Sequence, residues 1–114
     1  MWKTKLKVKY NKETNPKEFT LVEPLVWNDI SVPIGFVTDF ASVPKYLRWI
    51  YPPQGKYSKA SVVHDRMYSV NWYTKELADK TFLNIMLHDG VNKKTAYLFY
   101  YSVKLFGGSR YGTK

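Results

Sequence analysis

The sequence predicts an α+β fold in which an N-terminal antiparallel meander of three strands is followed by a short helix and three longer helices. Two patterns indicate this class. Apolar residues and lysines alternate along residues 2–10, which is typical of a half-buried strand. Apolar residues recur at helical spacing in residues 58–70, 74–89 and 95–106. With 114 residues, 45% of them hydrophobic, the chain suits a single domain over residues 1–114.

Three strands are expected, at residues 2–10, 19–27 and 30–37. The lysines on the outer face of the first strand would also protect a sheet edge from unwanted pairing. Asn28 and Asp29 are turn-forming residues between the second and third strands. An antiparallel meander is therefore the most economical arrangement.

The helix boundaries are expected at residues that favour helix ends. Pro44 is well placed in the first turn of a short helix that continues to Tyr51. Ser58 is expected to cap the first helix of the central pair, and Thr74 the second. Gly90 fits a C-terminal stop after that second helix.

The central helix pair is expected to bring a histidine and a carboxylate together. A tight turn near residues 71–73 would make the two helices antiparallel, so residues equidistant from the turn should face each other. His64 and Asp79 are equidistant from Trp72 within one residue, and Tyr68 lies one turn after His64 on the same face. A carboxylate bonded to one imidazole nitrogen raises the basicity of the other, which can then take a proton from water. The alternative is a structural hydrogen bond between the helices.

Two further carboxylates are candidate metal ligands. Asp65 points about a third of a turn away from His64, so it is expected to be nearby and partly exposed. A solvated helix carboxylate is its default interpretation, and a metal role gains weight if Asp39 approaches it. Asp39 could instead cap the helix at Pro44 or close a turn. The site is expected in a cleft between residues 38–44 and the helix pair.

The composition limits the classes of function. The formal charge is +9, which is compatible with nucleic acid, an anionic membrane surface or an acidic protein partner. The lysines are spread along the chain and no nucleic-acid-binding motif is present, so a solubilising basic surface is favoured over a DNA groove. The absence of cysteine excludes disulfides and a cysteine zinc site. No apolar run is long enough for a transmembrane segment.

Several short motifs between about Val32 and Gly107 resemble one family in their order. They are Pro-Ile-Gly-Phe-Val-Thr-Asp-Phe-Ala-Ser-Val-Pro at 33–44, Gly-Lys-Tyr at 55–57, His-Asp at 64–65, Ala-Asp at 78–79 and Asp-Gly-Val at 89–91. The family consists of small proteins that are common in bacteriophages and prophages and is known as domain of unknown function 1353. The resemblance implies a phage origin and no particular activity.

A second resemblance concerns the helix pair alone. His-Asp-Arg-Met-Tyr at 64–68 and Ala-Asp-Lys-Thr-Phe at 78–82 are similar to the two active-site helices of phospholipase A2, closest to the cysteine-poor bacterial and parvoviral capsid forms. This resemblance implies a phospholipase A2-like hairpin in which His64 would act as general base on water. Asp79 would orient His64, and Tyr68 would support Asp79. Asp65 would ligate a calcium ion, with Asp39 in the position of the calcium loop.

The sequence favours a small phage-encoded hydrolase with a His-Asp dyad and a carboxylate-bound metal, calcium rather than zinc. Its substrate would be an anionic phospholipid or, as a second choice, another bond of the cell envelope. The alternative is a non-enzymatic protein of the virion or tail, with other virion proteins as partners, or an antagonist of host defence. In that case the dyad is structural. Either protein would be found in the host cytoplasm or in the virion.

Overall fold

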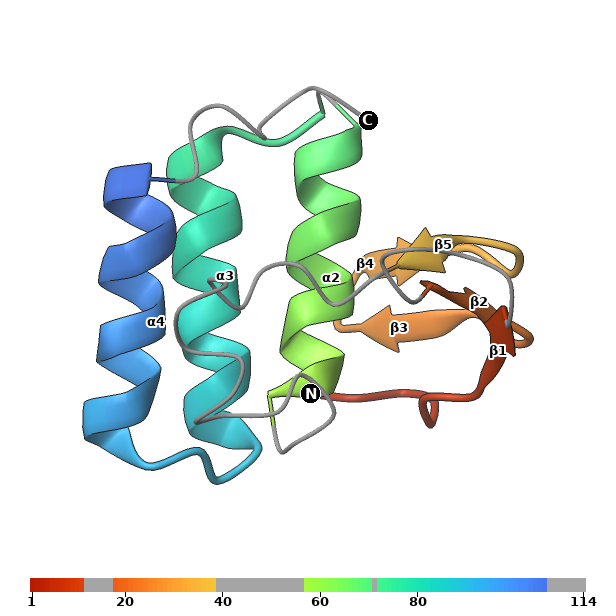
Figure 1. The fold of residues 1–114 in the computed structure, drawn as a ribbon, viewed down its shortest axis with the longest axis horizontal. Coiled ribbons are helices and arrows are strands. Elements are labelled where there is room, and N and C mark those ends of the chain that lie inside the picture. Colours follow the sequence, from red (N-terminus) through yellow and green to blue (C-terminus); the bar gives the residue numbers. More distant parts are fainter. Residues whose placement is uncertain (12–17, 39–56, 71, 107–114) are drawn as a thin grey trace.

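The computed structural model describes residues 1–11, 18–38, 57–70 and 72–106. Within them the fold is α+β, as predicted, with short antiparallel strands followed by packed helices (Figure 1). The strands are β1 (Val8–Asn11), β2 (Glu18–Leu21), β3 (Leu25–Trp27), β4 (Ile30–Val32) and β5 (Val37–Thr38), and the helices are α2 (Ser58–Ser69), α3 (Lys75–His88) and α4 (Lys93–Phe106). The short helix expected from Pro44 lies outside the described residues.

The described strands form two small antiparallel sheets, so the prediction of one three-stranded meander was wrong. One sheet has the order β1-β2-β5, and the other is the hairpin β3-β4. Each of the second and third predicted strands is divided by a bend. Pro24, which has no amide hydrogen to donate to a ladder, lies between β2 and β3. Gly35, with a φ of +87°, lies between β4 and β5.

The alternating segment at residues 2–10 forms a regular ladder only at its end, in β1. Its beginning runs beside β3 instead, where Trp2 forms an isolated bridge with Trp27. The amide of Lys3 donates to the carbonyl of Val26 at 2.9 Å. The alternating residues therefore form one extended segment that hydrogen-bonds to β3 at its beginning and to β2 at its end.

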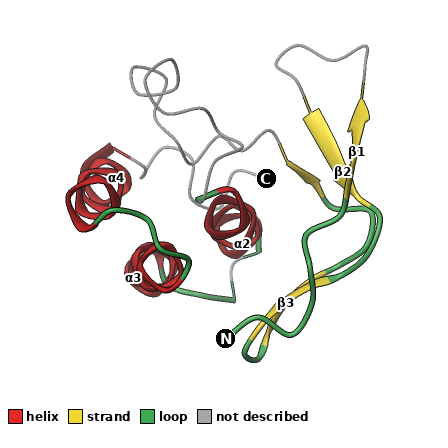
Figure 2. Ribbon diagram, turned by 90° about the horizontal axis from the view of Figure 1, so that it is seen from below, coloured by secondary structure: helices red, strands yellow, loops and turns green. Residues whose placement is uncertain are grey.

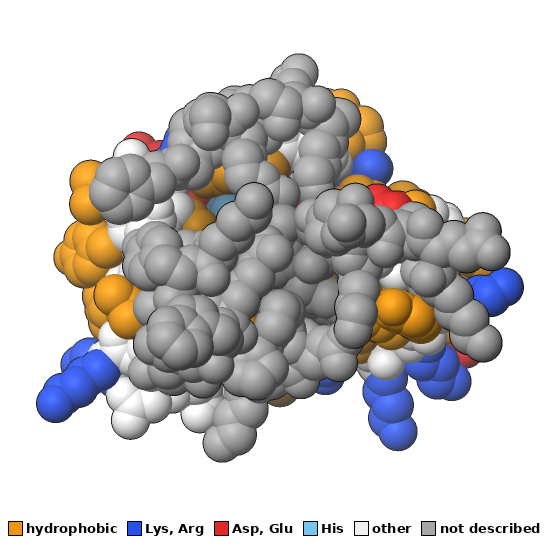
Figure 3. All heavy atoms as spheres, viewed as in Figure 1, with side chains coloured by type: hydrophobic (Ala, Val, Ile, Leu, Met, Phe, Trp, Pro, Cys, Tyr) orange, Lys and Arg blue, Asp and Glu red, His pale blue; other side chains and the backbone are white. Residues whose placement is uncertain are grey.

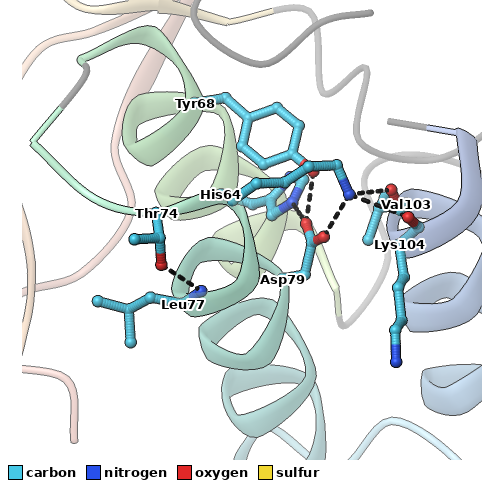
Figure 4. Close-up of polar contacts among 8 residues, drawn as sticks. His64, Tyr68, Thr74, Leu77, Asp79, Val103 and Lys104 are labelled. Carbon is cyan, nitrogen blue, oxygen red and sulfur yellow. Dashed lines mark hydrogen bonds and ion pairs between the residues drawn. The ribbon is translucent and has the colours of Figure 1, made fainter. Parts of the chain in front are cut away.

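The ends of α3 follow the sequence signals. Thr74 Oγ1 accepts a hydrogen bond from the amide of Leu77 at 3.1 Å, so the predicted N-cap is confirmed (Figure 4). At the other end Gly90 has a φ of +85°, and the amide of Val91 donates to the carbonyl of Met86 at 3.0 Å. This is the hydrogen-bond pattern with which glycine commonly ends a helix.

The starts of the other two described helices differ from the prediction. Ser58 does not cap α2, because the N-cap position is Tyr57 and no side chain caps that end. The last helix begins before the predicted Thr95, since Asn92 Oδ1 accepts from the amide of Lys94 at 2.9 Å. None of the helices in the described part of the chain combines the length and the apolarity needed to cross a membrane.

Helix α2 lies between the strands and the other two helices, with α3 beside it and α4 beside α3 (Figures 1 and 2). Because neighbours cover it on several sides, most of its side chains are buried. They are Ala60, Ser61, Val62, Val63, His64, Asp65, Met67 and Tyr68. Polar residues of α2 therefore lie inside the molecule, where each needs a compensating partner.

Aromatic contacts fix the N-terminal segment to the end of α3. Trp2 Nε1 donates to Asp89 Oδ1 at 2.7 Å, and the Trp2 and Trp27 rings meet edge to face at 4.9 Å. The ring of His88 packs against Trp27 at 5.0 Å. The strands and the helices are thus joined at the same end of α3 that Gly90 terminates.

Candidate functional site

The hydrogen bond predicted between His64 and Asp79 is present across the α2–α3 seam. His64 Nε2 lies 2.8 Å from Asp79 Oδ1 (Figure 4). The side chains are 2% and 3% exposed, respectively. Water therefore screens the interaction little, and it is stronger than a surface pair of the same geometry would be.

Two more side chains bind the same carboxylate. The hydroxyl of Tyr68, which was predicted to share a helix face with His64, donates to Oδ1 at 2.5 Å. Lys75 Nζ donates to Oδ2 at 2.8 Å. Both oxygens of Asp79 are therefore occupied, which fixes the orientation of the carboxylate toward His64.

Lys75 was missed by the sequence reasoning, although it lies four residues before Asp79 on the same helix face. Such pairs are usually exposed and weak, and nothing in the sequence showed that this one faces α4. In the structure its ammonium also donates to the carbonyls of Val103 at 2.9 Å and Lys104 at 3.1 Å. Those carbonyls belong to the last turn of α4, where backbone acceptors lack helical partners and carry a partial negative charge. One ammonium thus joins α3 to the end of α4.

The imidazole of His64 is also held by its ring neighbours. Its centroid lies 4.1 Å from that of Tyr68 and 4.7 Å from that of Phe82. Because the Asp79 carboxylate can only accept, a neutral His64 must carry its proton on Nε2. The lone pair of Nδ1 is then the basic site of the ring.

The pKa of Asp79 reflects these contacts. Burial alone would raise the pKa of this carboxyl, because it disfavours the charged form. Hydrogen bonds from His64, Lys75 and Tyr68, together with the charge of His64, outweigh burial and lower the pKa below its ordinary value of 3.8. Asp79 is therefore an anion at neutral pH.

Of the two predicted metal ligands, Asp65 lies within the described residues and Asp39 does not. Asp65 was expected to be partly exposed, but it is 3% exposed because α2 is covered on several sides. Asp39 and the cleft expected at residues 38–44 lie outside the described residues, apart from Thr38, which is buried. In the described ranges, no group of three or more His, Cys, Asp or Glu side chains could hold a metal ion.

A pocket of about 370 Å³ lies elsewhere, between the β3–β4 hairpin and α3. On α3 it is lined by Leu77, Thr81 and Asn84. Helical geometry places this stripe on the side of α3 opposite to Asp79. The pocket therefore does not lead to the dyad.

Fold and site together define an α+β domain with a His-Asp-Tyr-Lys network between its three described helices, in which the His, Asp and Tyr are buried and the Lys is half-buried. The chain belongs to the family described as protein of unknown function (DUF1353), whose model matches residues 17–103. This confirms the predicted family, and the match spans every residue of the network. Among curated proteins and among solved structures, none matches the chain.

Replacing Asp79 by Asn is expected to lower the free energy of unfolding at neutral pH by about 1.5–3 kcal/mol, because hydrogen bonds to a buried ionised group are lost. The pKa of Asp79 is lower in the folded chain than its ordinary value of 3.8. The Asp79 charge therefore stabilises the folded state fully above pH 3.8, and this stabilisation is lost as the pH falls through the pKa of the folded chain. The difference between wild type and variant should therefore shrink only below pH 3.8. Urea denaturation of both proteins at a series of pH values measures this difference in the free energy of unfolding.

Asp29→Asn is the matched control, because Asp29 is exposed and forms no ion pair or side-chain hydrogen bond within the described residues. It should follow wild type at every pH. A difference for Asp79→Asn that stays constant through the acidic range would contradict a stabilising role of the Asp79 charge.

Replacing Lys75 by Met is expected to lower the free energy of unfolding by about 1–3 kcal/mol, because Asp79 Oδ2 and the α4 carbonyls lose their shared donor. Lys80→Met is the control, since Lys80 forms an exposed pair with Glu76 at 3.6 Å. That pair should contribute about 0.5 kcal/mol or less. Equal losses in both variants, measured by urea denaturation, would mean that Lys75 acts only as a surface charge.

Proposed function

We propose that the protein is a small phage-encoded hydrolase in which His64 is the general base and Asp79 orients it. The observation that supports this most is the bond from His64 Nε2 to a carboxylate whose own oxygens are fixed by Tyr68 and Lys75. This arrangement sets the tautomer of the imidazole, and in the proposed reaction Nδ1, which carries the basic lone pair, accepts the proton. The roles proposed for His64 and Asp79 are those that the phospholipase A2 resemblance implies.

The proposed reaction is a direct attack of water on an ester. His64 Nδ1 removes a proton from water as its oxygen forms a bond to the carbonyl carbon. Asp79, ionised because of its low pKa, stabilises the imidazolium that forms. His64 then returns the proton to the departing alkoxide, so that an ester and a water give an acid and an alcohol.

A calcium ion held by Asp65 and Asp39 is a further part of the proposal, with zinc as the second choice. Calcium takes about six to eight oxygen ligands. Toward such a set the described residues supply the carboxylate of Asp65, which is 3% exposed, while Asp39 lies outside them. The proton transfer is therefore derived without a metal. A bound ion would add stabilisation of negative charge on the ester oxygen.

A phospholipid ester is the first proposed substrate and a bond of the cell wall is the second. The likeness of residues 64–68 and 78–82 to the phospholipase A2 helices supports the lipid, as does the formal charge of +9, which attracts anionic headgroups. A phage could use such an enzyme during envelope penetration or lysis, from the virion or from the host cytoplasm. Nucleic acid plays no part in this proposal.

The second candidate is a non-enzymatic protein of the virion or tail, with other virion proteins as partners, or an antagonist of host defence. The observation that favours it is the burial of the dyad, with His64 only 2% exposed. In that case the network serves to hold α2, α3 and α4 together. Activity of the dyad variants separates the two candidates.

The proposed hydrolysis is tested by fatty-acid release from mixed phospholipid vesicles, with calcium or with chelator. His64→Ala should lose about 10²–10⁴-fold in rate, because the proton-transfer contribution disappears. Asp79→Ala should fail in the same way, and the double variant should be little worse than either, since the two groups act as one unit. His88→Ala is the matched control, because His88 is an exposed histidine at the end of α3, and it should retain activity.

The calcium proposal has its own variant in this assay. Asp65→Asn should lose activity through weaker metal binding and should recover in part when calcium is raised. If wild type and His64→Ala release the same background amount, and calcium leaves the melting temperature unchanged, the hydrolase proposal is refuted. The virion or antagonist candidate then takes its place.

A further inference from the structure

We propose that the outward face of α4 docks the protein on an anionic phospholipid surface. Three apolar or aromatic residues, Leu98, Tyr101 and Leu105, are spaced i, i+3 and i+7 along this helix and therefore share one face. We call them the α4 stripe. Lys94, four residues before Leu98, continues the same line at the start of the helix.

The α4 stripe is exposed although the rest of the helix is anchored in the core. Leu98 is 43% exposed, Tyr101 50% and Leu105 69%. The buried face carries Ala96, Phe99 and Val103. Figure 3 shows hydrophobic side chains gathered along the edge of the molecule where Figure 1 places α4. The core fixes which way α4 faces, so the stripe is presented on a rigid element and is not needed to complete the core.

Lysines lie at both ends of the α4 stripe. Lys93 and Lys94 are exposed at its start, and Lys104 is exposed near its end. Lys104 Nζ lies 5.9 Å from the ring centroid of Tyr101, so its charge stays beside the stripe. An apolar face bordered by lysines has the chemistry of helices that lie in a membrane interface. The leucines would enter the acyl boundary, Tyr101 would lie at the headgroup level, and the ammonium groups would reach the phosphates.

The charges favour lipid over a second copy of the chain. In an antiparallel two-fold pairing of α4 helices, Lys93 and Lys94 of one copy would meet Lys104 of the other, and in a parallel pairing each lysine would meet its equivalent. Both arrangements place like charges together in a protein whose formal charge is already +9. An anionic surface neutralises the same lysines. The choice of a phospholipid surface as the ligand of the α4 stripe rests on the proposed function, because phospholipid is the first substrate proposed there.

Vesicle binding without turnover tests this inference. The full chain is sedimented with vesicles of phosphatidylcholine alone or with phosphatidylglycerol added, at low and high salt. Wild type should bind the anionic vesicles, and salt should weaken binding because it screens the lysines. The double variant Leu98→Gln/Leu105→Gln should bind about tenfold more weakly or worse, since it removes two apolar side chains from the interface. Lys94→Gln should lose about fivefold on anionic vesicles only.

Leu87→Gln is the matched control, because Leu87 is a 38% exposed leucine on α3 outside the stripe, and it should bind like wild type. If the double variant binds anionic vesicles as tightly as wild type, lipid docking by α4 is refuted. It is also refuted if wild type forms a dimer that the double variant loses while neither binds vesicles, because the stripe is then a contact between copies. Since sedimentation measures binding alone, neither result depends on whether His64 catalyses hydrolysis.

Discussion

The carboxylate of Asp79 is the group on which the arrangement of the three described helices depends. A buried carboxylate is costly unless it is fully hydrogen-bonded, and here its donors come from different parts of the chain. His64 and Tyr68 reach it from α2, and Lys75 reaches it from its own helix. Because Lys75 also binds the last carbonyls of α4, the position of that helix is tied to the same charge. Removing the carboxylate would take an acceptor from His64, Tyr68 and Lys75 at once.

The sequence predicted the part of the site that local periodicity determines. Helical spacing and a short turn were enough to place His64 opposite Asp79 and Tyr68 beside it, and the cap at Thr74 and the stop at Gly90 set the register of α3. These are relations within one helix or across one turn. They require no knowledge of how more distant elements pack.

The features that were missed depend on packing between elements far apart in sequence. Asp65 was expected to be partly exposed because a carboxylate on a helix usually is, and the sequence did not show that α2 is buried along most of its length. Lys75 has the spacing of an ordinary surface pair, and only the position of α4 makes it a link between helices. Each predicted strand contains at least one observed strand, but these strands do not form one sheet, because the bends near Pro24 and Gly35 divide the second and third predicted strands.

Helix α4 connects the two proposals physically. Its last carbonyls accept hydrogen bonds from Lys75, and its outward face carries the α4 stripe near the same end. A helix held at its C-terminus by the half-buried ammonium of Lys75 offers a rigid face to a surface, and the same ammonium fixes the carboxylate that orients His64. The polar network therefore supports both the orientation of the imidazole and the presentation of the stripe.

The central claim is that Asp79 fixes His64 as one tautomer with its basic nitrogen at Nδ1. Nitrogen-15 NMR of the histidine side chains, recorded as the pH is raised until the ring signals stop changing, tests this most directly. The account predicts that His64 carries its proton on Nε2, that this proton exchanges slowly with water, and that Nδ1 is unprotonated, while the exposed His88 serves as an internal reference. A His64 ring protonated on Nδ1, or a mixture of tautomers like that of a free imidazole, would contradict it.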